Sequence, residues 1–445
     1  MVERARTVAR GAKRAPETFD IDKASPYDFR FMAIAELLAD VLGGDLPIEV
    51  RAYDGSRAGP VDAPAALVLR SPNALKRMVT APGELGLGRA YVAGDLDVEG
   101  DLFAVLSLHK RLDGLHLSPR QFASLLQLVG VSALRPLPVP PEEARLRGRP
   151  HTRARDAAAI SFHYDMSNEF YALLLGRTLT YSCAVWSSPT IGLEAAQVAK
   201  HELVCRKLAL EPGMRLLDVG CGWGSMLMHA ARHHGVRGVG VTLSREQAEL
   251  GAKRVAEAGL SDFVEIRYQD YRDVRDGPYD AISSIGMFEH VGLSQLEAYF
   301  VGLLQLLRPE GRLLNHGISR APGNRGKPRR WARGFIDSYV FPDGELHEVG
   351  SVISTIQDRG FEVRHVESLR EHYPLTLRAW LANLEANWDA AVEMIGEPRT
   401  RVWRLYLAAS TARFEDNAVQ VHQVLAVKPD GGSSGMPLRP VFTAP

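Results

Sequence analysis

The chain has 445 residues, of which 46% are hydrophobic and 24% are charged, and its formal net charge is zero. This length exceeds what one hydrophobic core usually fills, so we expect two domains, and the neutral charge gives no sign of a nucleic-acid partner. The three cysteines form no CxxC pair, and the sequence shows neither a secretion signal nor an apolar run long enough to span a bilayer. These observations exclude a disulfide framework and predict a cytoplasmic protein without a membrane-spanning helix.

Three basic stretches interrupt the neutral average. Residues 1–14 hold five Arg or Lys against one Glu, residues 145–155 hold five Arg and no acid, and residues 319–334 hold six basic residues and no acid. Taken singly, each stretch is typical of a solvated loop. Together they predict contact with phosphate or an anionic phospholipid surface, which would place the protein peripherally at the inner face of the membrane.

The first third of the chain predicts a small module. Residues 1–25 are expected to form a disordered basic arm, and residues 26–134 a small α+β domain. In that domain the apolar spacing of residues 28–42 predicts a helix, and residues 46–59 predict two short strands around a turn. Dimerisation and membrane docking are both open as roles for this domain, so a homo-oligomer is one expectation.

The rest of the chain predicts a second, larger domain. Residues 135–158 are rich in Pro and Arg and indicate a linker, residues 159–430 form the domain, and residues 431–445 indicate a flexible tail. Within the domain, strand-like runs alternate with helical stretches, which predicts a Rossmann-like α/β fold with a parallel, doubly wound sheet. A ligand would bind at the carboxyl ends of the strands.

A glycine-rich loop follows the first of these strands. The sequence LLDVGCGWGS spaces Gly220, Gly222 and Gly224 as GxGxG and places Asp218 two residues before the first glycine. A dinucleotide loop is spaced GxGxxG, and a carboxylate beside it would repel a pyrophosphate. The same carboxylate suits an ammonium or a sulfonium group, so S-adenosylmethionine (AdoMet) is the predicted ligand.

The ends of the next two strands supply further candidate cofactor contacts. Thr242, Ser244 and Gln247 would lie near the ribose and methionine parts of AdoMet, and they replace the acidic residue usual at this strand end. Asp270 and Tyr271 would flank the adenine.

Seven short motifs carry a family resemblance. They are HYDMSNEFY, TYSCAVW, LLDVGCGWG, VTLSREQ, GMFEHVG, NHGI and SYVFPDGEL, between residues 163 and 346. In order and spacing they resemble the cyclopropane fatty acid synthase family over about residues 160–425. The resemblance implies a class I AdoMet-dependent methyltransferase that acts on the double bond of an unsaturated acyl chain, mostly in a phospholipid.

The resemblance also implies an anion-binding site. In the family a bound bicarbonate is thought to act as the base, and the matching positions here are Cys183, Glu289, His316, the Ile318 backbone and Tyr339. Beside a bicarbonate, Glu289 is expected to have a raised pKa or to make the anion more basic. For Cys183 the alternative is a small core residue. By the same resemblance, Tyr181 and Ser182 would contact the methionine end of AdoMet.

Departures from the family pattern leave the product open. Glu169 stands where a shorter acid is usual, and we expect it to lie near the anion and to shift the base. The product is then either a cyclopropane or an exocyclic methylene, which a separate reductase would convert to a methyl branch. A methyltransferase for a small amine or phenol, and a non-catalytic lipid-binding protein, are the alternatives. Cys183, Cys205 and the pair His233 and His234 lack metal-ligand spacing, so no metal site is predicted.

Overall fold

The computed structural model describes residues 33–108, 135–321 and 334–442, except residues 147, 150 and 165, together with a few positions between 121 and 130. The predicted arm at residues 1–25, the basic stretch at residues 1–14 and most of the one at residues 319–334 lie outside the described residues. None of the helices in the described ranges is both long and apolar enough to cross a membrane.

The smaller unit is built on a four-stranded sheet with the order β2-β1-β3-β4. β1 and β3 are parallel, and the other two pairs are antiparallel. Ile48 and Val50 belong to a separate hydrophobic core there, beneath α1. Its elements are α1 (Ile34–Val41), β1 (Glu49–Arg51), β2 (Arg57–Ala58), β3 (Ala65–Leu69), α2 (Pro72–Thr80), α3 (Glu84–Val92), β4 (Leu96–Gly100) and α4 (Leu102–Leu106).

The larger unit contains a seven-stranded sheet with the order β10-β11-β9-β8-β5-β6-β7. The five strands from β9 to β7 are parallel, and β11 runs antiparallel between β9 and β10. The strands are β5 (Arg215–Val219), β6 (Arg237–Thr242), β7 (Val264–Tyr268), β8 (Tyr279–Ile285), β9 (Leu307–Arg320), β10 (Glu362–Ser368) and β11 (Val419–Val427). The predicted parallel, Rossmann-like sheet is confirmed.

Helices cover both faces of this sheet because successive residues of a strand point to opposite sides. Leu216 packs with residues of α9 and α10, whereas Leu217 packs with residues of α13 and α15. The helices of this unit are α7 (Arg153–Tyr164), α8 (Asn168–Leu175), α9 (Leu193–Leu208), α10 (Ser225–His234), α11 (Arg245–Glu257), the short 3-10 helix η2 (Tyr271–Asp273), α12 (Phe288–Val291), α13 (Leu293–Leu306), α14 (Phe335–Tyr339), α15 (Val349–Asp358), α16 (His372–Ala386), α17 (Trp388–Ile395) and α18 (Glu397–Glu415).

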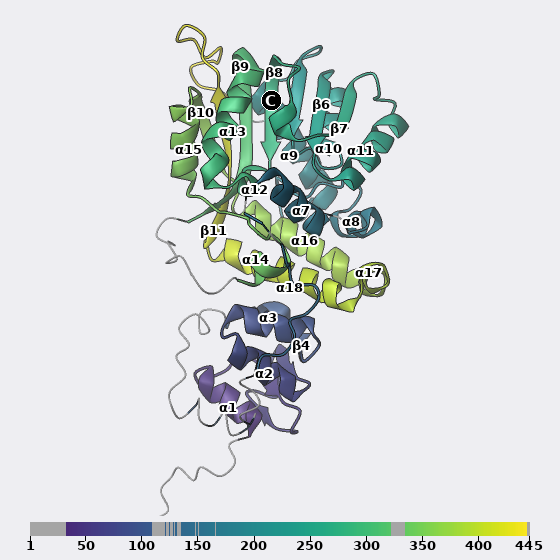
Figure 1. Ribbon diagram of the computed structural model, residues 1–445, viewed down its shortest axis with the longest axis vertical. Coiled ribbons are helices and arrows are strands. Elements are labelled where there is room, and N and C mark those ends of the chain that lie inside the picture. Colours follow the sequence, from purple (N-terminus) through teal and green to yellow (C-terminus); the bar gives the residue numbers. More distant parts are fainter. Residues whose placement is uncertain are drawn as a thin grey trace, which may run out of the picture.

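The two units meet through the layer formed by α14 and α18, which separates them in Figure 1. Arg401 on α18 reaches Asp97 of β4, with both terminal nitrogens 3.3 Å from its carboxylate oxygens. Between this layer and the carboxyl ends of the parallel strands lie α7, α12 and α16 (Figure 1). That placement makes these helices the outer wall of any site at the strand ends.

Two arginines of one predicted basic stretch form intramolecular ion pairs. Arg153 and Arg155 lie in residues 145–155, which were expected to face phosphate or lipid, and Arg145 and Arg149 of the same stretch are exposed. Arg153 pairs with Asp273, and Arg155, only 4% exposed, pairs with Asp343. These two arginines therefore fasten α7 to the larger unit.

Candidate active site

A cleft opens at the carboxyl ends of β5, β6 and β8. The strand order reverses between β5 and β8, because β6 and β7 extend the sheet on one side of β5 and β8 and β9 extend it on the other. The cleft encloses about 920 Å³, open solvent at the mouth included. Such a switch point is the expected ligand position in an open parallel sheet. The predicted cofactor residues that line the cleft are Tyr181, Ser182, Asp218, Gly220, Gly222, Thr242, Gln247 and Tyr271.

The glycine loop forms the floor of this cleft. Gly220 has a φ of +76°, which disfavours any residue with a side chain, and a Cβ there would lie 3.1 Å from the Met287 sulfur. Just before the loop, Asp218 accepts a hydrogen bond of 2.6 Å from the Ser283 hydroxyl. Burial raises the pKa of Asp218 to about 6. The backbone therefore comes close to the space where a cofactor would lie, next to one carboxyl group.

Three predicted cofactor residues lie outside the cleft lining. Gly224 and Ser244 precede α10 and α11, and the Ser244 hydroxyl accepts the Gln247 backbone N–H. Asp270 precedes η2 and is held by Arg272 at 2.7 Å. These residues shape the loops that present Gln247 and Tyr271.

Lys200 on α9 also lines the cleft, and the sequence motifs did not reveal it. Its side chain is fully buried, and its ammonium donates to the Ser182 hydroxyl over 3.0 Å. Burial lowers the pKa of Lys200 to about 8, although the nearby Asp218 opposes this shift. Burial of an ammonium costs free energy, and an anionic group of a bound ligand would offset this cost. Other lining residues that were missed are His201, Gln269 and Met287.

Glu289 and Ile318 meet next to the cleft, because β8 and β9 end side by side. Glu289 Oε1 accepts the Ile318 backbone N–H at 2.7 Å. Glu289 Oε2 is buried and has no hydrogen-bond partner among the described residues. Burial raises the pKa of Glu289 to about 7, against the opposing effect of the Ile318 N–H. Near neutral pH this carboxyl is thus able both to donate and to accept a proton.

His316 lies two residues before Ile318 on β9, and a buried polar chain supports it. Lys207 donates to the Gln423 side-chain oxygen at 2.7 Å, and the Gln423 amide nitrogen lies 3.2 Å from His316 Nδ1. An ammonium can only donate, so the Gln423 oxygen faces Lys207 and its NH₂ group faces the ring. His316 Nδ1 is therefore the acceptor, and the proton of the neutral ring is on Nε2. Burial lowers the pKa of His316 to about 3, which keeps the ring neutral.

Three predicted site residues, Cys183, Tyr339 and Glu169, are not among the residues that line the cleft. Cys183 is fully buried in the hydrophobic core, its thiol 3.3 Å from the Ala184 carbonyl and 3.8 Å from that of Leu369, and burial raises its pKa. Tyr339 lies on α14 beside the ion pair of Arg89 and Glu143, outside the cleft lining.

Glu169 is exposed in the first turn of α8, whereas Glu289 is buried. A helix N-terminus favours an acidic residue at the Glu169 position.

An aromatic wall adjoins the cleft. Tyr181 lines the cleft, and its hydroxyl donates to that of Tyr406 at 3.1 Å. The Tyr181 ring also lies 5.3 Å from Trp380 and 5.9 Å from Trp403, between ring centres. Tyr181 thus connects the cleft to a buried cluster of aromatic rings, whose faces carry partial negative charge.

Comparisons with known proteins agree with this geometry. The family model described as mycolic acid cyclopropane synthetase matches residues 151–424. A probable fatty acid methyltransferase of Mycobacterium tuberculosis is 47% identical over 422 residues, covering 92% of this chain and 98% of the relative. The cyclopropane-fatty-acyl-phospholipid synthase of Escherichia coli K12 is 34% identical over 375 residues, covering 83% and 90%.

A solved structure points the same way. The mycolic acid cyclopropane synthase CmaA1, complexed with S-adenosylhomocysteine (SAH) and CTAB, has a TM-score of 0.58 and 35% identity, and the match covers 61% of this chain and 98% of that one. The parallel sheet, the glycine loop at its switch point and the extent of these matches lead to one assignment. The chain belongs to the mycolic acid cyclopropane synthetase family and is an AdoMet-dependent methyltransferase.

Proposed function

We propose that this enzyme transfers a methyl group from AdoMet to the double bond of an unsaturated acyl chain carried by a membrane phospholipid. The observation that carries the proposal is the buried, unpartnered Oε2 of Glu289, whose neighbours Met287 and His290 line the cofactor cleft. A proton acceptor in an apolar site suits an alkene, which loses a proton only after its methylation. The names of the two relatives support acyl chains as the substrate class, and one of them supports a phospholipid.

The cleft residues fit AdoMet group by group. Asp218 offers a carboxyl beside the glycine loop, which suits the ammonium or the sulfonium. The side chains of Thr242 and Gln247, which are hydrogen-bonded to each other at 2.8 Å, suit the ribose. The Tyr271 ring suits the adenine. We assign the AdoMet carboxylate to Lys200, because this buried ammonium lies 3.0 Å from the Ser182 hydroxyl in the cleft. When bound, AdoMet supplies the methyl group and leaves as SAH.

A bicarbonate fits beside Glu289, and we propose it as the base. With a pKa of about 7, the Glu289 carboxyl can donate its proton from Oε2 to one anion oxygen. His316 would donate from Nε2, since Gln423 occupies Nδ1. These residues hold the anion, and the surrounding burial excludes water from the reacting chain.

The aromatic wall determines what the methylated chain encounters. Methyl transfer to one alkene carbon leaves a cation on its neighbour, and the Tyr181 ring in the cleft lining can offer an electron-rich face to that cation. Loss of a proton from the new methyl group closes a cyclopropane. If a hydride first shifts, loss of the same kind of proton gives an exocyclic methylene. Both routes consume one AdoMet and release one proton, and the methylene product would need a separate reductase to become a methyl branch.

The test is an assay of the purified enzyme with methyl-labelled AdoMet and vesicles of dioleoyl phosphatidylglycerol. We expect a gain of one CH₂ per modified acyl chain, with the label retained, by mass spectrometry. Proton NMR then separates ring protons from vinylidene protons and decides the product. Vesicles with saturated chains are the matched control and should stay unmodified.

Two results would contradict this function. Acyl chains that stay unchanged while AdoMet is consumed on a small amine or phenol would assign the enzyme to a different acceptor. Turnover on a free unsaturated fatty acid, with none on the vesicles, would exclude the phospholipid as the substrate. Glu289→Gln should reduce turnover far more than AdoMet affinity, whereas equal losses in both would exclude Glu289 from the proton-transfer step.

A further inference from the structure

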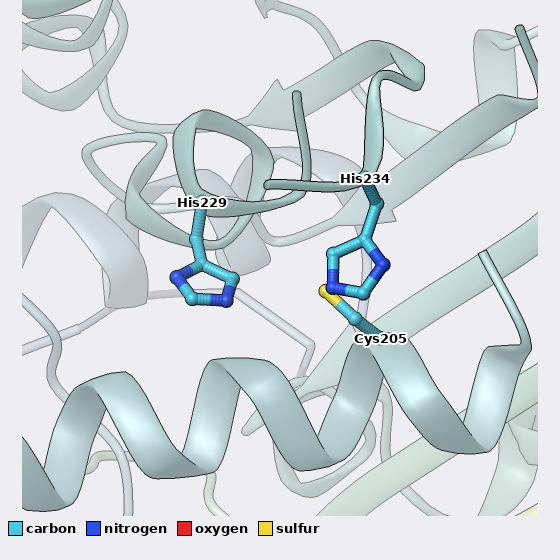
Figure 2. Close-up of side chains that lie close together, drawn as sticks. All are labelled: Cys205, His229 and His234. Atoms are coloured by element: carbon cyan, nitrogen blue, oxygen red, sulfur yellow. The ribbon is translucent and has the colours of Figure 1, made fainter. Parts of the chain in front are cut away.

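A second cluster of reactive side chains lies between α9 and α10, outside the cleft lining. Figure 2 shows Cys205 of α9 facing His229 and His234 of α10. One ligand atom from each, the sulfur and two ring nitrogens, all lie within 4.8 Å of one another. The sequence did not indicate this grouping, because its members come from two helices and His229 takes the place expected for His233. Cys183 is not part of it.

The separations are close to those of a metal site. Zinc–sulfur and zinc–nitrogen bonds of about 2.3 and 2.0–2.1 Å place tetrahedral ligand atoms about 3.4–3.6 Å apart. Each pair here would close by no more than about 1.4 Å, which side-chain torsions allow for imidazole rings near a surface. The side chains of His229 and His234 are 9% and 18% exposed, so an ion can reach them.

Glu202 places a carboxylate beside the two histidines of this group. Its Oε2 lies 3.3 Å from His229 Nε2 and 3.1 Å from His234 Nε2. Glu202 and Cys205 are three residues apart on α9, so both face α10. The donor set is one thiolate, two imidazoles and one carboxylate, which suits a borderline-soft divalent ion and not Mg²⁺ or Ca²⁺.

We propose that Glu202, Cys205, His229 and His234 bind one divalent ion of the zinc class, which links α9 to α10. Four protein donors leave no open position, so the ion is structural and takes no part in methyl transfer. Both helices also serve the cofactor cleft. α9 carries Lys200, and α10 begins directly after Gly224. The Cys205 thiol releases its proton to the solvent when the ion binds.

The test is a titration of the untagged, chelator-treated full-length protein with Zn²⁺, and with Co²⁺ as a spectroscopic substitute. We expect one ion per chain and a thiolate-to-cobalt charge-transfer band. Cys205→Ser should abolish this band, and His234→Gln should weaken Zn²⁺ binding about 10- to 100-fold. His365→Gln, a substitution of a half-buried histidine on β10, is the matched control and should bind Zn²⁺ like the wild type.

Several outcomes would overturn the site. Wild-type protein that takes up neither ion at micromolar concentration has no such site. Binding that His234→Gln leaves unchanged is adventitious. Because Cys205 is buried, circular dichroism must show that Cys205→Ser is folded. If Cys205→Ser is unfolded, His234→Gln, at a partly exposed residue, tests the site alone. Weaker Zn²⁺ binding by this variant supports the site, and unchanged binding contradicts it.

Discussion

At the scale of single residues, the burial of Glu289 links catalysis to the stability of the fold. The pKa of its carboxyl is about 7 when folded, against an ordinary value of 4.5. Between these pH values the folded state holds more protons than the unfolded state, so stability is full below pH 4.5 and falls as the pH rises through 7. The difference corresponds to roughly 3 kcal/mol.

Glu289→Gln should therefore remove the loss of stability that accompanies a rise in pH. We expect the wild type to lose about 2.5 kcal/mol relative to the variant between pH 5 and pH 8, measured by urea unfolding at both pH values. Asp218 contributes equally to both proteins and cancels. Glu169→Gln, the same change at an exposed position, should leave the wild-type pH profile intact. Identical profiles for the wild type and Glu289→Gln would contradict the buried carboxyl.

Lys200→Met tests the recognition of the AdoMet carboxylate. A charge-assisted hydrogen bond contributes about 1.5–3 kcal/mol, so AdoMet and SAH should both bind about 10- to 100-fold more weakly, by calorimetry. Decarboxylated AdoMet should bind the variant and the wild type alike. A loss of the same size for this analogue would show that Lys200 only supports the cleft. Lys253→Met on the exposed face of α11 is the control.

At the scale of elements, the meeting of β9 and α12 aligns the proposed anion site. A Cβ on Gly317 would lie 1.9 Å from a ring carbon of Phe288, the residue directly before Glu289. The glycine between His316 and Ile318 thus lets α12 come close enough for Glu289 to reach the Ile318 N–H.

Gly317→Ala should displace Phe288 and with it Glu289. We expect a stability cost of about 1–3 kcal/mol and a loss of turnover with little change in AdoMet affinity. A Cβ on Gly302 of α13 would meet no atom of the described residues within 4 Å, so Gly302→Ala should be neutral or stabilising by up to about 1 kcal/mol. Unchanged turnover in Gly317→Ala would show that α12 tolerates the shift.

The same elements show how far the sequence alone could lead. Motifs at strand ends predicted the parallel sheet and the glycine loop, because local spacing determines both. Lys200, Gln423 and Lys207 carry no motif, since they reach the site from a helix or from a distant strand. β10 and β11 were not predicted, and Cys183, Tyr339 and Glu169 were assigned by resemblance to surroundings that depend on the packing of α8, α14 and α16.

At the scale of the whole molecule, α14 and α18 join the two units through apolar packing against α3 and α4 and through polar pairs. Arg401 pairs with Asp97 and lies over the Tyr91 ring at 5.2 Å, and its side chain is 11% exposed. Arg401→Met should lower the free energy of unfolding by about 1–3 kcal/mol and increase proteolysis between the units. Substitution of the exposed Arg245, which pairs with Glu249 within α11, should change stability by less than about 0.5 kcal/mol. Equal proteolysis of Arg401→Met and wild type would show that other contacts hold the units together.

The position of β11 has a consequence for how the enzyme is made. This strand, Val419–Val427, is inserted between β9 and β10, and its Gln423 pairs directly with His316. A growing chain on the ribosome would already carry the glycine loop, Glu289 and His316, yet it would lack the neighbour that sets the proton position of that histidine. If His316 holds the anion as proposed, methyl transfer depends on β11, the strand that is made after all the others in this sheet.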